Sequence, residues 1–197
     1  MKLDRSFYTC GVLEASEKLL GKILVHRTEE GVTKGRIVEL EAYNGAIDKA
    51  AHSYPSLCTE RTKIQFGEGG YAYVYFIYGM YYCMNIVTGR SKEPESVLLR
   101  AIEPVEGIEL MKKRRGTDKL RNLCSGPGKL CQAMGITKDQ YGMDLCGDIL
   151  YLEDAEPVAP EDILKTKRIN VDYAEEAKDF LWRYVIKGSP FASVKGE

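Results

Sequence analysis

The sequence has neither a long hydrophobic run nor a targeting segment. Its 197 residues are 44% hydrophobic and 29% charged, and no apolar stretch approaches the ~20 residues that a helix needs to cross a bilayer. The N-terminus does not follow the charged-then-apolar plan of a secretory signal. The composition is that of an ordinary globular chain. We therefore expect a cytoplasmic protein that makes no membrane contact.

Metal and nucleotide-binding patterns are also missing. The six cysteines are scattered, no C-x-x-C pair occurs and only two histidines are present, so a zinc site would lack its usual ligands. Reduced structural thiols are the favoured interpretation for a cytosolic chain. The G-x-G-x-x-G fingerprint of a dinucleotide site is absent as well. We expect neither a metal ion nor an organic cofactor.

The chain also has little net charge. A formal charge of −1 and a pI near 6.2 mean that global attraction cannot hold the protein on nucleic acid, so any such binding must be local. The densest basic segment, residues 112–121, carries six Lys or Arg residues against one Asp, and Lys129 follows it. Such a segment is either a solvated helix end or loop, or a set of phosphate contacts.

Strand patterns dominate what is present. β-rich segments that predict strands cover 22–27, 33–40, 71–78, 81–88, 97–102 and 148–152. Helical patterns cover 12–20, 107–115 and 128–134, with a late helix or extended segment over 174–184. The strands and helices segregate without a βαβ rhythm. The sequence therefore predicts a single compact α+β domain over residues 1–197, with a mixed antiparallel sheet, peripheral helices and a protruding β-hairpin.

Residues 44–70 form a predicted loop that lacks sustained periodicity. A loop of about 25 residues is uncommon inside a compact domain and is often functional. It is a candidate wall of an active site.

The central predicted hairpin is rich in tyrosine, which supplies six of the twelve residues around its turn. Tyr71, Tyr73 and Tyr75 share one strand face by the period of two, and the first two fit ordinary packing in a sheet. Tyr78 breaks this parity beside a glycine suited to a tight turn, so its ring can project from the tip. A projecting ring can wedge between base steps, and an inner ring such as Tyr75 can stack on an extruded base.

Two carboxylates, Glu39 and Glu41, end the second predicted strand on one face. They are either two exposed charges or the machinery of glycosidic hydrolysis, in which a carboxylate activates water and stabilises an oxocarbenium-like transition state. The catalytic interpretation depends on whether Asp48, His52 and Arg100 lie nearby.

Three further residues have both a structural and a functional interpretation. His52 could bond a loop backbone group, or as a neutral imidazole it could orient water or contact a base edge. Asn85 could be a core amide, or it could reject bases with an unsuitable exocyclic group. Arg100 could simply pair a carboxylate, or it could hold Glu41 ionised.

Motifs in chain order extend over nearly the whole sequence. They are LLGK at 19–22, GRIVE at 35–39, EAY at 41–43, Asp48 with AHS at 51–53, YVY at 73–75, IYGMY at 77–81, CMN at 83–85, VLLRA at 97–101, EP at 103–104, SGPGKLCQA at 125–133 and WR at 182–183. On these motifs the sequence resembles the alkyladenine (3-methyladenine) DNA glycosylases of the eukaryotic MPG type.

The resemblance implies a β-hairpin that enters the DNA minor groove and a pocket for an extruded purine. It implies that Glu41 is the general base and that Arg100 and the backbone of His52 help to hold the attacking water. Residues with the other implied roles are Tyr43, His52, Tyr75, Asn85 and Leu98 in the base pocket, with Asn85 as the gate against guanine, Tyr78 as the intercalating wedge with Met80 and Tyr81 beside it, and Arg61 and Lys129 at the DNA backbone.

The implied reaction is excision of alkylated or deaminated purines, of the 3-methyladenine and hypoxanthine type, from double-stranded DNA. Water activated by Glu41 would cleave the N-glycosidic bond and leave an abasic site. No lysine occupies the position of a Schiff-base nucleophile beside Glu41, so no strand cleavage is expected. Nothing in the sequence requires more than a monomer.

Two positions depart from the family pattern, and two other classes of function stay open. Glu60 stands where the family has a proline and Asn170 where it has a glycine, and we expect both to lie away from the chemistry.

A non-catalytic nucleic-acid-binding module is disfavoured by the intact Glu41, His52 and Arg100. A nucleosidase for free nucleosides would have no use for a wedge or a basic segment.

Overall fold

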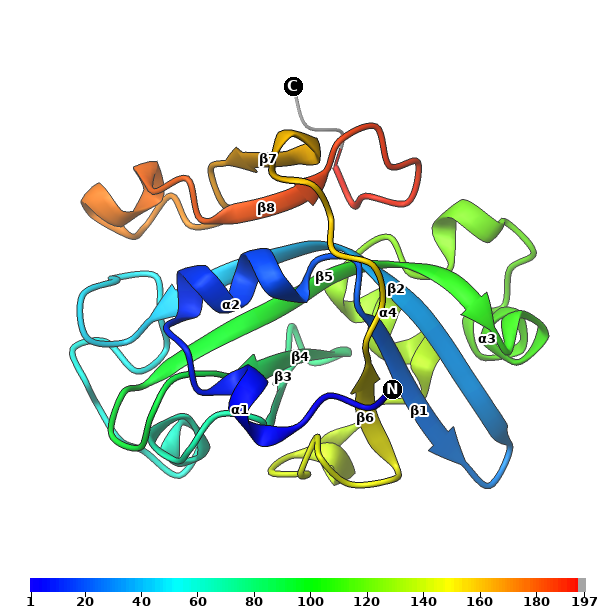
Figure 1. Ribbon diagram of the computed structural model, residues 1–197, viewed down its shortest axis with the longest axis horizontal. Coiled ribbons are helices and arrows are strands. Elements are labelled where there is room, and N and C mark those ends of the chain that lie inside the picture. Colours follow the sequence, from blue (N-terminus) through cyan, green and yellow to red (C-terminus); the bar gives the residue numbers. More distant parts are fainter. Residues whose placement is uncertain (195–197) are drawn as a thin grey trace.

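The computed structural model describes residues 1–194, and a long central strand organises it (Figure 1). β2 (Gly31–Asn44) pairs along most of its length with β5 (Glu95–Glu106). On its other edge the first half pairs with β1 (Ile23–Thr28) and residues 39–41 pair with β8 (Arg183–Ile186). With both edges covered, residues 37–42 of β2 are all buried. The two glutamates of this stretch therefore lie inside the protein.

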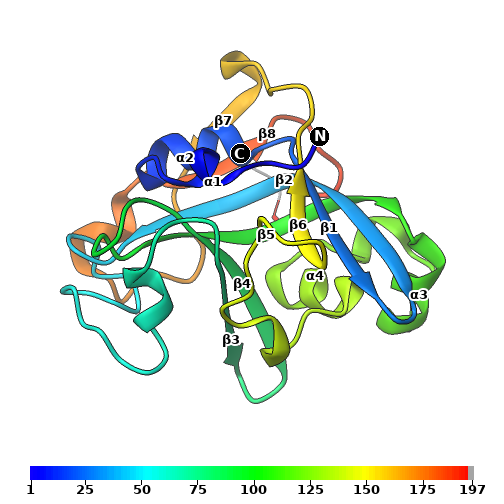
Figure 2. The same cartoon turned by 60° about the horizontal axis from the view of Figure 1, so that its bottom comes forward.

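The remaining strands extend this sheet in antiparallel pairs. They are β3 (Ala72–Ile77), β4 (Tyr81–Val87), β6 (Leu150–Glu153) and β7 (Ile163–Thr166). The sheet order is β3-β4-β5-β2-β1-β6, with β7 attached through β8. The predicted α+β class, the N-terminal hairpin and the antiparallel meander are confirmed. Figure 2 shows the end of the β3–β4 hairpin projecting from the body of the protein.

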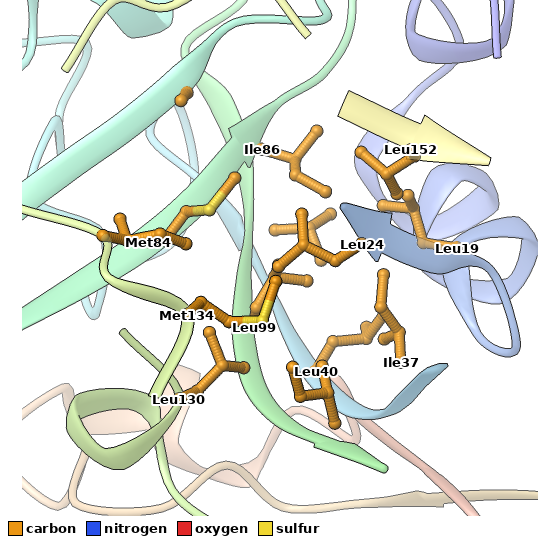
Figure 3. Close-up of a cluster of buried hydrophobic side chains, with 14 of the residues drawn as sticks. Leu19, Leu24, Ile37, Leu40, Met84, Ile86, Leu99, Leu130, Met134 and Leu152 are labelled. Carbon is orange, nitrogen blue, oxygen red and sulfur yellow. The ribbon is translucent and has the colours of Figure 1, made fainter. Parts of the chain in front are cut away.

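Helices cover the sheet and enclose one main core. They are α1 (Arg5–Tyr8), α2 (Val12–Leu19), α3 (Ile108–Arg115) and α4 (Pro127–Met134). α2 packs on β2 and β5, while α4 packs on β4, β5 and α3. α4 buries Leu130, Cys131, Ala133 and Met134 at helical spacing. Figure 3 shows how side chains from α2, α4 and five strands meet in this core.

Several boundaries differ from the predictions for local reasons. The 174–184 segment forms a short 3-10 helix, Glu175–Asp179, before it reaches β8. β7 was missed because its four residues, ILKT, are half-buried or exposed and carry no apolar–polar alternation. α2 ends as predicted, with Gly21 at a φ of 82° after its C-cap. Across residues 1–194, no helix combines the length and apolar character that a bilayer crossing would need.

Gly45 fixes the start of the long loop to the end of β2. A Cβ at this position would lie 2.0 Å from the Ser53 Oγ and 2.9 Å from the Pro94 carbonyl oxygen. We expect Gly45→Ala to lower the free energy of unfolding by about 1–3 kcal/mol because the loop must move away. Urea denaturation measures this, with the exposed Ala46→Ser as a control expected to change it by less than about 0.5 kcal/mol. Equal stability of the two variants would show that the loop does not depend on this contact.

Candidate active site

A cavity of about 320 Å³ opens where the sheet meets the long loop, segment 169–173 and the first residues of α4. Its volume is in the range of small-ligand pockets. The structure brings together there Glu41, Tyr43, His52, Tyr75, Asn85, Leu98 and Arg100, with Tyr78 and Tyr81 also in the lining. Residues from four strands and from three segments outside the sheet therefore converge on one cavity.

Glu41 is fully buried and has a partner for each carboxylate oxygen. Its Oε1 accepts the backbone N–H of Ile169 at 2.8 Å and lies 3.3 Å from Nη1 of Arg100. Its Oε2 accepts the hydroxyl of Tyr43 at 2.7 Å. Burial and the nearby carboxylate raise the pKa of Tyr43 well above its usual value, so the phenol stays a donor. These contacts offset part of the cost of burying a charge and fix the carboxylate at the cavity wall.

Arg100 reaches both glutamates because the β2–β5 register shifts on either side of Glu39. Its Nε donates to Oε1 of Glu39 at 3.0 Å while Nη1 faces Glu41. Glu39 does not line the cavity. Its carboxylate also accepts Nε of Arg183 at 2.8 Å and the Ser193 hydroxyl at 2.7 Å. Bulges commonly redirect side chains beside active sites, and here they make Glu39 the counter-ion and leave Glu41 to face the cavity.

Asp48 is not a direct neighbour of Glu41, contrary to the suggestion from the sequence. It forms a fully buried ion pair with Arg168, whose Nη2 donates to Oδ1 at 2.8 Å. The guanidinium of Arg168 packs on the Tyr43 ring, 4.7 Å from its centroid. Asp48 therefore acts on the site indirectly, by holding the cation that supports a cavity wall.

His52 lies at the cavity mouth among aromatic rings. It packs edge-on against Tyr75 with 4.7 Å between ring centroids. Nη2 of Arg61 lies 3.3 Å from Nε2, and the Tyr73 hydroxyl lies 2.9 Å from Nδ1. Because a guanidinium can only donate, the neutral imidazole accepts at Nε2 and carries its proton on Nδ1. Partial removal from water and the Arg61 charge lower the pKa of His52 to about 4.

Tyr73 does more than pack in the sheet. It is only 1% exposed, as expected of a packing residue, yet it lines the cavity and binds His52. Asn85 is buried beside it and donates Nδ2 to the Tyr73 carbonyl at 3.1 Å, which fixes the orientation of its amide. Leu98 pairs with Asn85 across β4 and β5 and completes this wall with an apolar surface.

The tip of the β3–β4 hairpin is a turn with two left-handed residues. Tyr78 has a φ of 54° and Gly79 a φ of 66°, the backbone that a type I′ turn requires. Tyr78 is 73% exposed and Met80 is 67% exposed, with Tyr81 also exposed. Such a group of exposed apolar side chains marks a binding surface.

The basic side chains predicted to contact the DNA backbone, and those of the basic segment 112–121, differ in whether they are already bound within the protein. Arg61 is stacked on the Tyr75 ring at 4.7 Å from its centroid, whereas Lys129 is exposed on α4. In the basic segment, Arg114 pairs with Glu30 at 2.8 Å and Arg115 donates to the Leu123 carbonyl at 3.0 Å. These two arginines hold secondary-structure elements together. Lys119 and Arg121 are exposed.

Segment 169–173 was missed as a cavity wall. Ile169, Asn170, Val171 and Tyr173 all line the cavity. The expectation that Asn170 lies away from the chemistry is wrong: it follows the residue that binds Glu41 and has a φ of 60°, a conformation that Asn tolerates better than most residues. Glu60 does lie on the surface, paired with Lys63 at 2.7 Å.

The site contains no evident metal centre. Among residues 1–194, no group of three or more His, Cys, Asp or Glu side chains is arranged to hold an ion. The described residues do bring together a buried carboxylate at the wall of a tyrosine-lined cavity and an exposed aromatic turn beside it.

Comparison with known proteins defines the family. Residues 6–190 match the family described as "Methylpurine-DNA glycosylase (MPG)". The chain belongs to this family, and so to the DNA-repair hydrolases that act on N-glycosyl bonds.

Similar proteins of full length occur in several bacteria under the name "Putative 3-methyladenine DNA glycosylase". The chain is 55% identical to that of Alkaliphilus oremlandii (strain OhILAs), over 99% of this chain and 100% of the relative. It is 50% identical to that of Clostridium acetobutylicum, over 98% of each chain. It is 48% identical to that of Bacillus cereus (strain G9842), over 99% of this chain and 100% of the relative.

The protonation of His52 can be followed by NMR, because the chain has only two histidines. We expect its imidazole to stay neutral at pH 7 and to gain a proton only as the pH falls toward about 4. Unfolded histidine titrates near 6.5, so the unfolded chain takes up the proton first. The contribution of neutral His52 to the free energy of unfolding is therefore complete above pH 6.5, and it is lost as the pH falls from 6.5 toward about 4.

The variant Arg61→Gln should raise the pKa of His52, because a neighbouring positive charge is removed. The buried His26 serves as an internal control whose pKa should be the same in both proteins. A His52 pKa that is the same in wild type and in Arg61→Gln would contradict the influence of Arg61 on the imidazole.

Proposed function

We propose that this protein excises alkylated or deaminated purines, of the 3-methyladenine and hypoxanthine type, from duplex DNA. The observation that carries the proposal is the buried Glu41 carboxylate at the wall of a tyrosine-lined cavity, beside the exposed ring of Tyr78. The name shared by the relatives supports 3-methyladenine as a substrate.

Capture begins at the hairpin tip in this proposal. Tyr78 enters the base stack from the minor groove, with Met80 and Tyr81 beside it, and fills the space left by the extruded nucleotide. The base enters the cavity between Tyr43, His52 and Tyr75. The fixed amide of Asn85 lies on the wall that the base edge would meet, where the 2-amino group of guanine would find an unsuitable partner.

Hydrolysis then needs one water and one base. Glu41 accepts a proton from the water as its oxygen bonds to C1′ of the sugar, and the electron pair of the C1′–N bond leaves with the purine. Arg100 and the Ile169 N–H hold the carboxylate during this step. A cationic alkylated purine leaves as a neutral base, whereas a neutral lesion needs a proton in addition.

The expected product is an abasic site in an uncut strand. Strand cleavage by a glycosylase requires an amine nucleophile that forms a Schiff base. No lysine is among the residues from 1–194 that line the cavity, which supports hydrolysis alone.

Glu41→Gln is the direct test of the general base. The variant keeps the size of the side chain but cannot accept the proton, so base release should fall by roughly 10²- to 10⁴-fold. Release of 3-methyladenine and hypoxanthine from a labelled duplex gives the rate, and fluorescence anisotropy should show that DNA binding survives. Glu106→Gln, at an exposed position, should retain full activity. Normal turnover by Glu41→Gln would exclude the mechanism.

The same assay separates the alternative functions. A binding module would release no base from any substrate, and a nucleosidase would prefer free nucleosides. The proposed enzyme should act on damaged duplex in preference to both single strands and nucleosides.

Tyr78→Ser tests the wedge. Removing a ring that is 73% exposed should leave the fold intact, with less than about 0.5 kcal/mol change in stability. Binding to lesion-containing duplex should weaken by about tenfold or more, the range expected for loss of one stacked ring. Val105→Ser removes another exposed apolar side chain, 53% exposed, and should not affect binding. Equal affinities of the two variants would remove the wedge assignment.

A further inference from the structure

The charges around the cavity are compensated in pairs, with one exception. Glu39 and Glu41 share Arg100, and Glu39 also binds Arg183, so two carboxylates face two guanidinium groups. Asp48 is matched by Arg168 in the same way. These buried groups therefore sum to no net charge.

Arg61 is the exception. The ion pairs formed within residues 1–194 leave it without a carboxylate partner, since the neighbouring Glu60 pairs with Lys63. Arg61 instead contacts two cavity walls from outside the cavity. Its guanidinium carbon lies 4.7 Å from the Tyr75 ring centroid, and its Nη2 lies 3.3 Å from Nε2 of His52.

This position gives Arg61 an influence on whatever stacks inside the cavity. A cation on one face of a tyrosine occupies the ring's electron-rich π surface. It also repels a second positive charge on the opposite face and attracts a negative one. A base held against Tyr75 and His52 would experience this field through the two side chains.

We propose that Arg61 is a specificity-determining residue that lowers the preference for cationic purines relative to neutral ones. The inference rests on the proposed function, because it concerns the base that the cavity receives. A purine alkylated on a ring nitrogen enters with a positive charge that the guanidinium opposes. A neutral lesion such as hypoxanthine enters without this cost. As the C1′–N bond breaks, the base gains electron density, which the positive charge of Arg61 stabilises.

The test compares two substrates within each enzyme. Second-order rate constants for base release are measured with 3-methyladenine and with hypoxanthine in the same duplex sequence, for wild type and for Arg61→Gln. The rate constant for the cationic substrate divided by that for the neutral substrate should rise about three- to tenfold in the variant, which is the effect expected of one partly screened charge. Any loss of DNA affinity affects both substrates and cancels in the ratio.

Two further variants identify the cause. Arg61→Lys keeps the charge and should keep the ratio near that of wild type. Lys129→Gln removes a positive charge from the proposed DNA backbone contact, away from Tyr75, and should slow both substrates by the same factor.

The outcomes are distinguishable. An unchanged ratio in Arg61→Gln overturns the inference, as does an equal shift in Arg61→Lys or in Lys129→Gln. A wild-type protein that releases neither base overturns the proposed function itself.

Discussion

The buried guanidinium of Arg100 is the constraint on which the site depends. Two carboxylates, Glu39 and Glu41, enter the protein interior two residues apart on one strand, where each unpaired charge would carry a desolvation cost of several kcal/mol. A single planar fork with fixed geometry can bind both, which a lysine could not do as well. The shifted register between β2 and β5 is what places that fork between them. The chemistry proposed for Glu41 therefore depends on Glu39, although Glu39 is not among the residues that line the cavity.

A second buried pair extends this support to the far side of the cavity. Arg168 binds Asp48 and packs on Tyr43, and the next residue, Ile169, donates its backbone N–H to Glu41. The dipeptide of Arg168 and Ile169 thus fixes a wall of the cavity through its side chain and the proposed general base, Glu41, through its backbone. Rigid support of this kind holds a catalytic group in a productive orientation without reorganisation during the reaction.

Sequence patterns predicted the parts of this structure that depend on local signals. The period of two separated Tyr75 from Tyr78, and the turn glycine placed Tyr78 at the exposed tip, because both effects act over a few residues. The residue pattern made Glu41, His52 and Arg100 candidates, but each also had a structural interpretation, and the family resemblance was needed to choose between the two. The bond from Ile169 to Glu41 could not be predicted, since it spans 128 residues and uses a backbone donor that any amino acid supplies. The prediction that Asn170 lies away from the site was wrong for the same reason. The contact of Arg61 with Tyr75 and His52 could not be predicted either, because it depends on how the long loop folds back.

The buried charges of this protein are paired, whereas its aromatic hairpin tip is exposed. This contrast explains how a nearly neutral protein can act on DNA. With a formal charge of −1, the chain gains little from long-range attraction to phosphate. Its buried cations are neutralised by carboxylates, and Arg114 and Arg115 are engaged in packing. The cations that remain exposed, among them Arg61 and Lys129, are therefore the ones that can orient the duplex. In the proposed mode of binding, the aromatic tip and the cavity then supply much of the binding energy, so that the same contacts determine both the affinity for DNA and the recognition of the lesion.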